Sequence, residues 1–134
     1  MLKEDYVSFE VAKLLKEKGF DWGCFGKYSV RSKEFHLDCR RMCNNGGLFE
    51  CAAPTHQMAR RWLREEKGFH IVSSISYDTS MDVDGNEVDR RIFWFFEIFS
   101  SYSGNVIYTE EMTEYDSYEE AVEAALKYCL ENLI

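Results

Sequence analysis

The fold is decided by the stretch RIFWFFEIF, residues 91–99, whose apolar side chains alternate between the two faces of an expected β-strand. One face would carry Ile92, Trp94, Phe96 and Ile98, and the other Phe93, Phe95 and Phe99. A strand that is apolar on both faces is typical of the middle of a sheet, where helices or a second sheet cover both surfaces. The segment therefore predicts a central strand that is buried from both sides.

The sequence around this strand predicts an antiparallel meander. Residues 71–77 alternate with the two-residue period of a strand. The polar run DVDGN at 82–86 separates the two strands and is typical of a hairpin turn. A second turn at 103–105 leads into a short strand at 106–109.

Two amphipathic helices are expected before this meander. The first covers about 9–18, with Ser8 as its N-cap and Gly19 as a left-handed stop. The second begins after the N-cap Thr55 and ends at Gly68 in the same way. Both helices are therefore expected to end at a glycine in the left-handed conformation.

The third helix follows the S-x-x-E capping box of Ser117 and Glu120, and its apolar stripe continues to the end of the chain. Weaker strand signals lie at 24–30 and 34–39, and residues 48–50 are either a strand or an extended lead into a helix. The expected order is α-β-β-(β)-α-β-β-β-α. We therefore predict an α+β fold, a mainly antiparallel sheet covered by three amphipathic helices.

Length and composition fit a single globular domain over residues 1–134. The chain is 46% hydrophobic and 16% aromatic, which is far from the composition of disordered chains. It has no run of about 18 apolar residues that would span a membrane, and no apolar signal segment follows a basic start. Its five cysteines are an odd number, which favours reduced thiols. We expect a cytoplasmic protein that has no membrane contact.

The net charge of −8 is unevenly distributed along the chain. The first 67 residues hold 13 Lys or Arg and 10 Asp or Glu, whereas the last 67 hold 3 and 14. Two differently solvated surfaces explain this most simply. The same polarity would also orient a partner, or align two copies head to tail.

Thiols and imidazoles gather in the middle of the chain as Cys39, Cys43, Cys51 and His56, with His36 nearby. These are ligands that zinc takes, but no pair has the two-residue spacing that makes zinc motifs specific. A Cys–His nucleophile pair would use the same residues, yet no oxyanion-forming turn flanks them. We keep the four as weak metal candidates, favour ordinary reduced cysteines, and assign no catalytic residue, metal or cofactor.

The second helix carries a basic group of Arg60, Arg61, Arg64 and Lys67, a candidate interaction surface. Basic helices neutralise nucleic-acid phosphates, which is one interpretation of this face. Arg61 has Glu65 one turn along, however, as on an ordinary solvated helix, and the negative net charge opposes polyanion binding. Nucleic acid is thus the less favoured partner.

Glu97 is the unusual residue of the central strand, since it is flanked by Phe96 and Ile98. A carboxylate there either lies near the end of the sheet or has a partner and a raised pKa. The aromatic strand would also suit the wall of an apolar ligand pocket. Glu97 is therefore the first residue to inspect for a small-molecule or enzymatic site.

Three segments carry a resemblance to known proteins: DYVSFEVAKLLKEKGF at 5–20, CAAPTHQMARRWLRE at 51–65 and SYEEAVEAALKYCLENLI at 117–134. Together they resemble a family of short uncharacterised proteins of phages and mobile elements of gut bacteria. The match covers the three expected helices, roughly a third of the chain, and leaves the strands unaligned. The resemblance implies a phage-related origin but assigns no activity and no site residue.

The leading functional hypothesis is a non-enzymatic accessory domain that binds another protein, or a second copy of itself. It depends on the charge asymmetry, the abundance of aromatic residues and the lack of a specific catalytic motif. A pocket near Glu97 or the Cys/His loop is the alternative from the small-molecule or enzyme class. Nucleic-acid binding by the basic second helix is the third.

Overall fold

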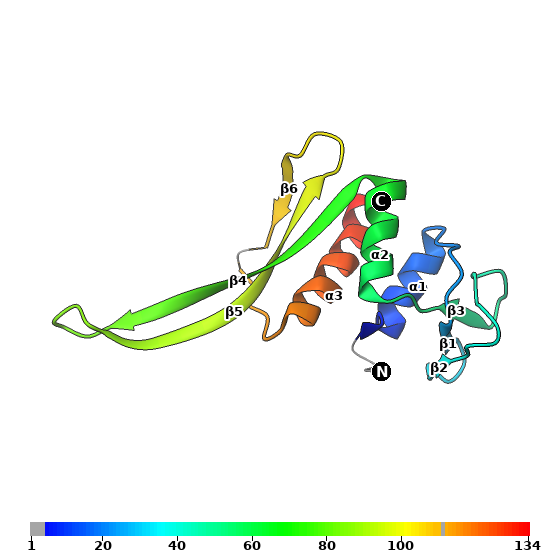
Figure 1. Ribbon diagram of the computed structural model, residues 1–134, viewed down its shortest axis with the longest axis horizontal. Coiled ribbons are helices and arrows are strands. Elements are labelled where there is room, and N and C mark those ends of the chain that lie inside the picture. The colour runs from blue at the N-terminus through cyan, green and yellow to red at the C-terminus, as the bar shows by residue number, and fades with distance from the viewer. Residues whose placement is uncertain (1–4, 111) are drawn as a thin grey trace.

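The α+β class and the predicted order of elements are confirmed by the computed structural model, which describes residues 5–110 and 112–134 (Figure 1). The elements are α1 (Phe9–Glu17), β1 (Gly26–Ser29), β2 (Phe35–Leu37), β3 (Glu50–Ala52), α2 (His56–Trp62), β4 (Phe69–Met81), β5 (Glu87–Ser100), β6 (Val106–Thr109) and α3 (Tyr118–Tyr128). Helices α2 and α3 continue into π-helical turns at Leu63–Lys67 and Cys129–Leu133.

The strands form two antiparallel sheets rather than the one that was expected. The smaller sheet has the order β2-β1-β3, and its strands are shorter than the sequence signals. Its third strand lies at 50–52, two residues beyond the expected position. The larger sheet has the order β4-β5-β6 and confirms the predicted meander, with β5 in the middle.

Local capping explains where the helices begin. The side chains of Ser8, Thr55 and Ser117 each accept a hydrogen bond from the backbone N–H three residues later, at 3.1–3.2 Å. The predicted capping box is only half formed, because the Glu120 carboxylate accepts from the N–H of Asp116 instead of Ser117. Each cap satisfies an N–H that the helix itself leaves without a partner.

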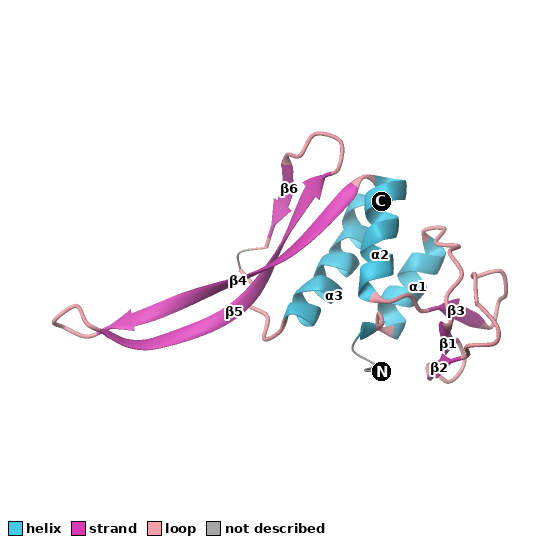
Figure 2. Cartoon of the chain, viewed as in Figure 1, coloured by secondary structure: helices cyan, strands magenta, loops and turns pink. Residues whose placement is uncertain are grey.

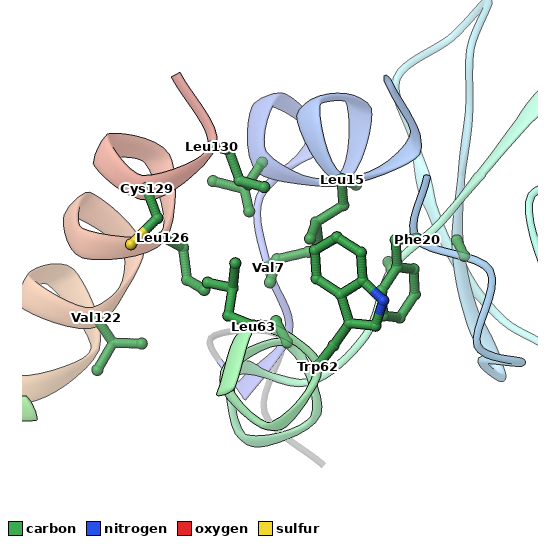
Figure 3. Close-up of a cluster of buried hydrophobic side chains, with 14 of the residues drawn as sticks. Val7, Leu15, Phe20, Trp62, Leu63, Val122, Leu126, Cys129 and Leu130 are labelled. Carbon is green, nitrogen blue, oxygen red and sulfur yellow. The ribbon is translucent and has the colours of Figure 1, made fainter. Parts of the chain in front are cut away.

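The core lies between the helices (Figure 3). Helix α3 packs on β4 and β5 with one side and on α1 and α2 with the other, and α1 also contacts β3. Side chains from all three helical regions meet there: Val7, Leu15, Phe20, Trp62, Leu63, Val122, Leu126, Cys129 and Leu130. The small sheet and the larger sheet thus lie on opposite sides of the helical layer (Figure 2).

The expectation that the central strand is buried from both sides is wrong. Phe96 and Ile98 are buried against the helices, but Phe93, Phe95 and Phe99 on the opposite face stay partly exposed. The reason is how the helices are used: α3 covers β4 and β5, whereas α1 and α2 pack on α3. One face of the β4-β5-β6 sheet therefore remains open.

The inner part of the β4–β5 hairpin packs on α3, and its outer part projects away from the helices (Figures 1 and 2). We call residues 75–92 the arm. Every residue from 77 to 92 is exposed. The register shifts between Ser80 and Met81, so the arm bends just before its tip.

Candidate functional site

The cysteines predicted as weak metal candidates do not gather with His56. Cys43 and Cys51 are buried, Cys43 pairing with Cys24 in an isolated bridge, whereas Cys39 is exposed. Burial raises the pKa of the Cys51 thiol. Within residues 5–110 and 112–134, no three His, Cys, Asp or Glu side chains are arranged to hold a metal ion. His36 is exposed on β2.

His56 has a different partner, which sequence reasoning missed. Its Nε2 lies 2.7 Å from the Oε2 of Glu123 on α3. The other oxygen of this carboxylate accepts a hydrogen bond from the backbone N–H of Ser8, at 2.9 Å. Burial by itself raises the pKa of Glu123, but the hydrogen bonds from His56 and Ser8 outweigh it and hold the pKa below its ordinary value.

An open groove of about 820 Å³ runs past this pair, between α1 and α3. Tyr6, Phe9 and Tyr28 form part of its apolar wall. The Tyr28 hydroxyl donates to the Val7 carbonyl oxygen at 2.8 Å, and the Glu123 carboxylate is held by two partners. These groups hold α1, α2 and α3 together, so a structural role accounts for them.

Glu97 faces the open side of the sheet, three residues before the end of β5, where β4 and β6 flank it. Its neighbours across the ladder are Val72 and Thr109, and the Thr109 hydroxyl donates to its carboxylate at 3.4 Å. The side chain is partly exposed. A shallow hollow of about 220 Å³ nearby is lined by Phe93, Phe95 and three polar residues, and Glu97 is not among them.

The basic group on α2 divides into engaged and free side chains. Arg60 is held inside, because its guanidinium donates to the Tyr118 hydroxyl and, at 3.4 Å, to the backbone oxygen of Ile71. Arg61 forms the predicted helical ion pair with Glu65 at 2.9 Å. Two of the four cations are therefore committed within the fold.

Arg64 and Lys67 have no ion pair among the described residues, and Lys67 lies over the Trp62 ring at 5.5 Å. A hollow of about 700 Å³ beside α2 is lined by three arginines, two carboxylates and a tyrosine, among other residues: Arg60, Arg61, Arg64, Asp5, Glu119 and Tyr118. The structure thus gathers positive charge at the base of β4, next to the place where the arm begins.

The outer edge of β4 is the longest unpaired backbone edge of the larger sheet. Within residues 5–110 and 112–134, β4 pairs only with β5, and Gly68 accepts from the N–H of Ser101 on that side. Because backbone groups alternate along a strand, even-numbered residues face β5 and odd-numbered residues face outward. The Arg60 contact to the outward oxygen of Ile71 agrees with this assignment. From Ser73 to Thr79 the outward groups have no described backbone partner.

Apolar side chains accompany this free edge. Ile75 and Tyr77 lie on the outward-facing residues of the arm and are 56% and 57% exposed. Their neighbours on β5 are Trp94 and Ile92, and Ile92 is also exposed. The Arg90 guanidinium lies 4.5 Å from the centroid of the Tyr77 ring. An apolar strip thus continues from the buried core onto the exposed arm.

The sequence contains a signal for this edge that the pattern analysis did not use. Residues 69–81 include no Pro, Lys or Arg, the residues with which proteins usually protect an edge strand. The two strands also continue through polar residues, beyond the alternating segment at 71–77 and the apolar run at 91–99. We therefore take the β4 edge and the arm as the candidate interaction surface.

No helix among the described residues is long and apolar enough to cross a membrane. Comparisons with protein-family models, with curated proteins and with solved structures found no match to this chain.

Proposed function

We propose that this chain is a non-enzymatic accessory domain that acts by binding another protein through its arm and the outer edge of β4. The observation that carries the proposal is the run of outward backbone groups from Ser73 to Thr79, which no described element pairs, beside the exposed side chains of Ile75 and Tyr77. A free strand edge binds an extended segment of another protein by adding a strand to the sheet.

The physical chemistry of the edge supports this proposal. Main-chain hydrogen bonds supply affinity for an added strand, and alternate side chains supply specificity. Burial of an exposed aliphatic or aromatic side chain contributes about 1.5–3 kcal/mol. A monomer that left this edge unused would carry an aggregation hazard without a benefit.

The other candidate surfaces give less support to an enzyme or a nucleic-acid binder. The His56–Glu123 pair and the Tyr28 hydroxyl are satisfied by contacts that join helices. Two of the four cations on α2 are engaged within the fold, and the net charge is −8. We place the binding function in the cytoplasm, and the resemblance of the helices favours an origin in phages or mobile elements of gut bacteria.

Site-specific photo-crosslinking tests the proposal. A photoreactive phenylalanine analogue is placed at Tyr77 and, as the matched control, at Tyr102, which is 83% exposed but lies outside the arm. In the native host, the Tyr77 probe should give a discrete protein adduct that the Tyr102 probe does not give. The second substitution Ile75→Lys should remove that adduct. Adducts that are absent, or equal from both positions, contradict the proposal.

A further inference from the structure

We infer that the partner of the β4 edge is a second copy of this chain, paired antiparallel through β4 about a two-fold axis; this inference rests on the proposed function. The pairing joins the two larger sheets into one continuous sheet. An isologous contact of this kind uses the same surface on both copies and closes as a dimer.

We choose the register that pairs the whole run of free outward groups, from Ser73 to Thr79. The outward residues available are the odd-numbered ones, and Ile71 is excluded because Arg60 already donates to its oxygen. Pairing therefore begins at Ser73, which lies opposite Thr79 of the second copy. In the same register Ile75 lies opposite Tyr77 of the second copy. Outward residues placed directly opposite each other exchange both backbone hydrogen bonds.

The side chains suit this register. Ile75 and Tyr77 are each more than half exposed in the single chain. The two-fold axis places Ile75 of each copy beside Tyr77 of the other copy, which gives two aliphatic–aromatic cross-strand pairs. Such pairs contribute to sheet stability beyond their burial. The strand side chains that the single chain leaves in solvent thereby cover one another.

Charge complementarity selects a second copy over an unrelated strand. The tip of the arm, residues 82–89, carries four carboxylates and no Lys or Arg. The register extends this tip past the second copy's Ile71 toward the base of its β4. There the three arginines Arg60, Arg61 and Arg64 outnumber the two carboxylates, of Asp5 and Glu119, in the lining of the hollow beside α2, and Lys67 lies at the base of β4.

The bend in the arm supports the same placement. The register of the hairpin shifts between Ser80 and Met81, which turns the tip away from the line of the strand. We place the bent tip beside the hollow, where Arg64 has no ion pair among the described residues.

Sedimentation equilibrium on the full chain tests the inference. The mass should rise from 15.8 kDa toward twice that value with concentration. Ile75→Lys should weaken the dimer by about tenfold or more. Val106→Lys is the matched control, since Val106 is a β-branched strand residue with 53% exposure and lies on β6, away from the arm and from the β4 edge. It should leave the dissociation constant unchanged.

A charge exchange tests the contact between tip and helix. Arg64→Glu with Lys67→Glu should weaken the dimer, and adding Asp84→Lys with Asp89→Lys should restore it. The exchange breaks no ion pair among the described residues, although it removes the Lys67 ammonium from above the Trp62 ring. Circular dichroism and thermal unfolding verify that each variant is folded. Failure of the second pair to restore the dimer overturns the predicted register.

The remaining outcomes separate the inference from the proposed function. A mass of 15.8 kDa at every concentration, or equal weakening by Ile75→Lys and Val106→Lys, overturns self-pairing. If such a monomer still yields a Tyr77 adduct with a different protein, the proposed function stands without self-pairing. A monomer with no Tyr77 adduct overturns both.

Discussion

The imidazole Nε2 of His56 lies 2.7 Å from the Oε2 of Glu123, and this contact joins residues 67 positions apart in the chain. His56 is the first residue of α2, and Glu123 lies in α3. The backbone N–H of Ser8, the N-cap of α1, donates to the other oxygen of the carboxylate. One half-buried carboxylate therefore holds together the beginnings of two helices and the middle of a third.

We expect His56→Ala to lower the free energy of unfolding by about 1–3 kcal/mol, because it leaves a half-buried carboxylate with one partner fewer. Urea titration at neutral pH measures this loss. Glu119→Gln is the control, since Glu119 is an exposed carboxylate of the same helix without a described partner. A His56→Ala variant as stable as wild type would contradict a structural role for the pair.

The same carboxylate makes stability depend on pH. The pKa of Glu123 in the folded chain is below its ordinary value of 4.5, because the hydrogen bonds from His56 and Ser8 outweigh the effect of burial. A lowered folded pKa contributes stability that is present above the ordinary pKa and is lost as the pH falls through the folded pKa. Glu123→Gln should therefore flatten the decline of unfolding free energy below about pH 5. Glu119→Gln should not.

The two glycines that end helical segments should differ in their tolerance of alanine. Gly68 and Gly19 have φ angles of +79° and +93°, so both substitutions incur about 1–2 kcal/mol of left-handed strain. At Gly68 an added Cβ would also lie 2.3 Å from the Tyr102 ring, whereas at Gly19 it meets nothing within 4 Å. Gly68→Ala should be the more destabilising substitution in thermal unfolding. Adding Tyr102→Ala should bring its cost down to that of Gly19→Ala.

Thiol reactivity should single out one cysteine. Cys39 is exposed, whereas burial raises the pKa of Cys24 and Cys129 to about 12 and also raises that of Cys51. A chromogenic disulfide reagent should detect one fast thiol in the native chain and five after denaturation. Cys39→Ser should remove the fast phase. A second fast thiol in the native chain would contradict the burial of the others.

The features that sequence predicted well are local. The caps at Ser8, Thr55 and Ser117 depend on contacts three residues apart, and those contacts are present. The hairpin turn at 82–86 follows from residues that favour turns, and the Asp82 N–H donates to the Asn86 oxygen. The place of β5 in the middle of its sheet follows from its apolar run.

The features that sequence missed depend on distant parts of the chain. Phe93 and Phe95 make the second face of β5 apolar as well, and this pattern is visible in the sequence. The sequence does not show that α1 and α2 pack on α3 and so leave that face open. In the sequence, Glu123 looks like any charged residue on a helix, because its contacts with His56 and Ser8 depend on the tertiary fold. The outer arm is held by cross-strand register and not by burial, so no apolar pattern marks it.

Hydrogen exchange along β4 should alternate in a chain that is held monomeric by Ile75→Lys. The N–H groups of Ser74 and Ser76 face β5, while those of Ser73 and Tyr77 face outward without a described backbone partner. Outward amides should exchange faster, on the order of tenfold, the ratio that 1.4 kcal/mol of protection gives. Residue-resolved exchange by NMR measures the difference. Equal protection of both sets in the monomer would show that the edge is already covered from within the chain. In the wild-type chain, protection of Ser73 and Tyr77 should rise with protein concentration while Ser74 and Ser76 change little, because an added strand reaches only the outward groups.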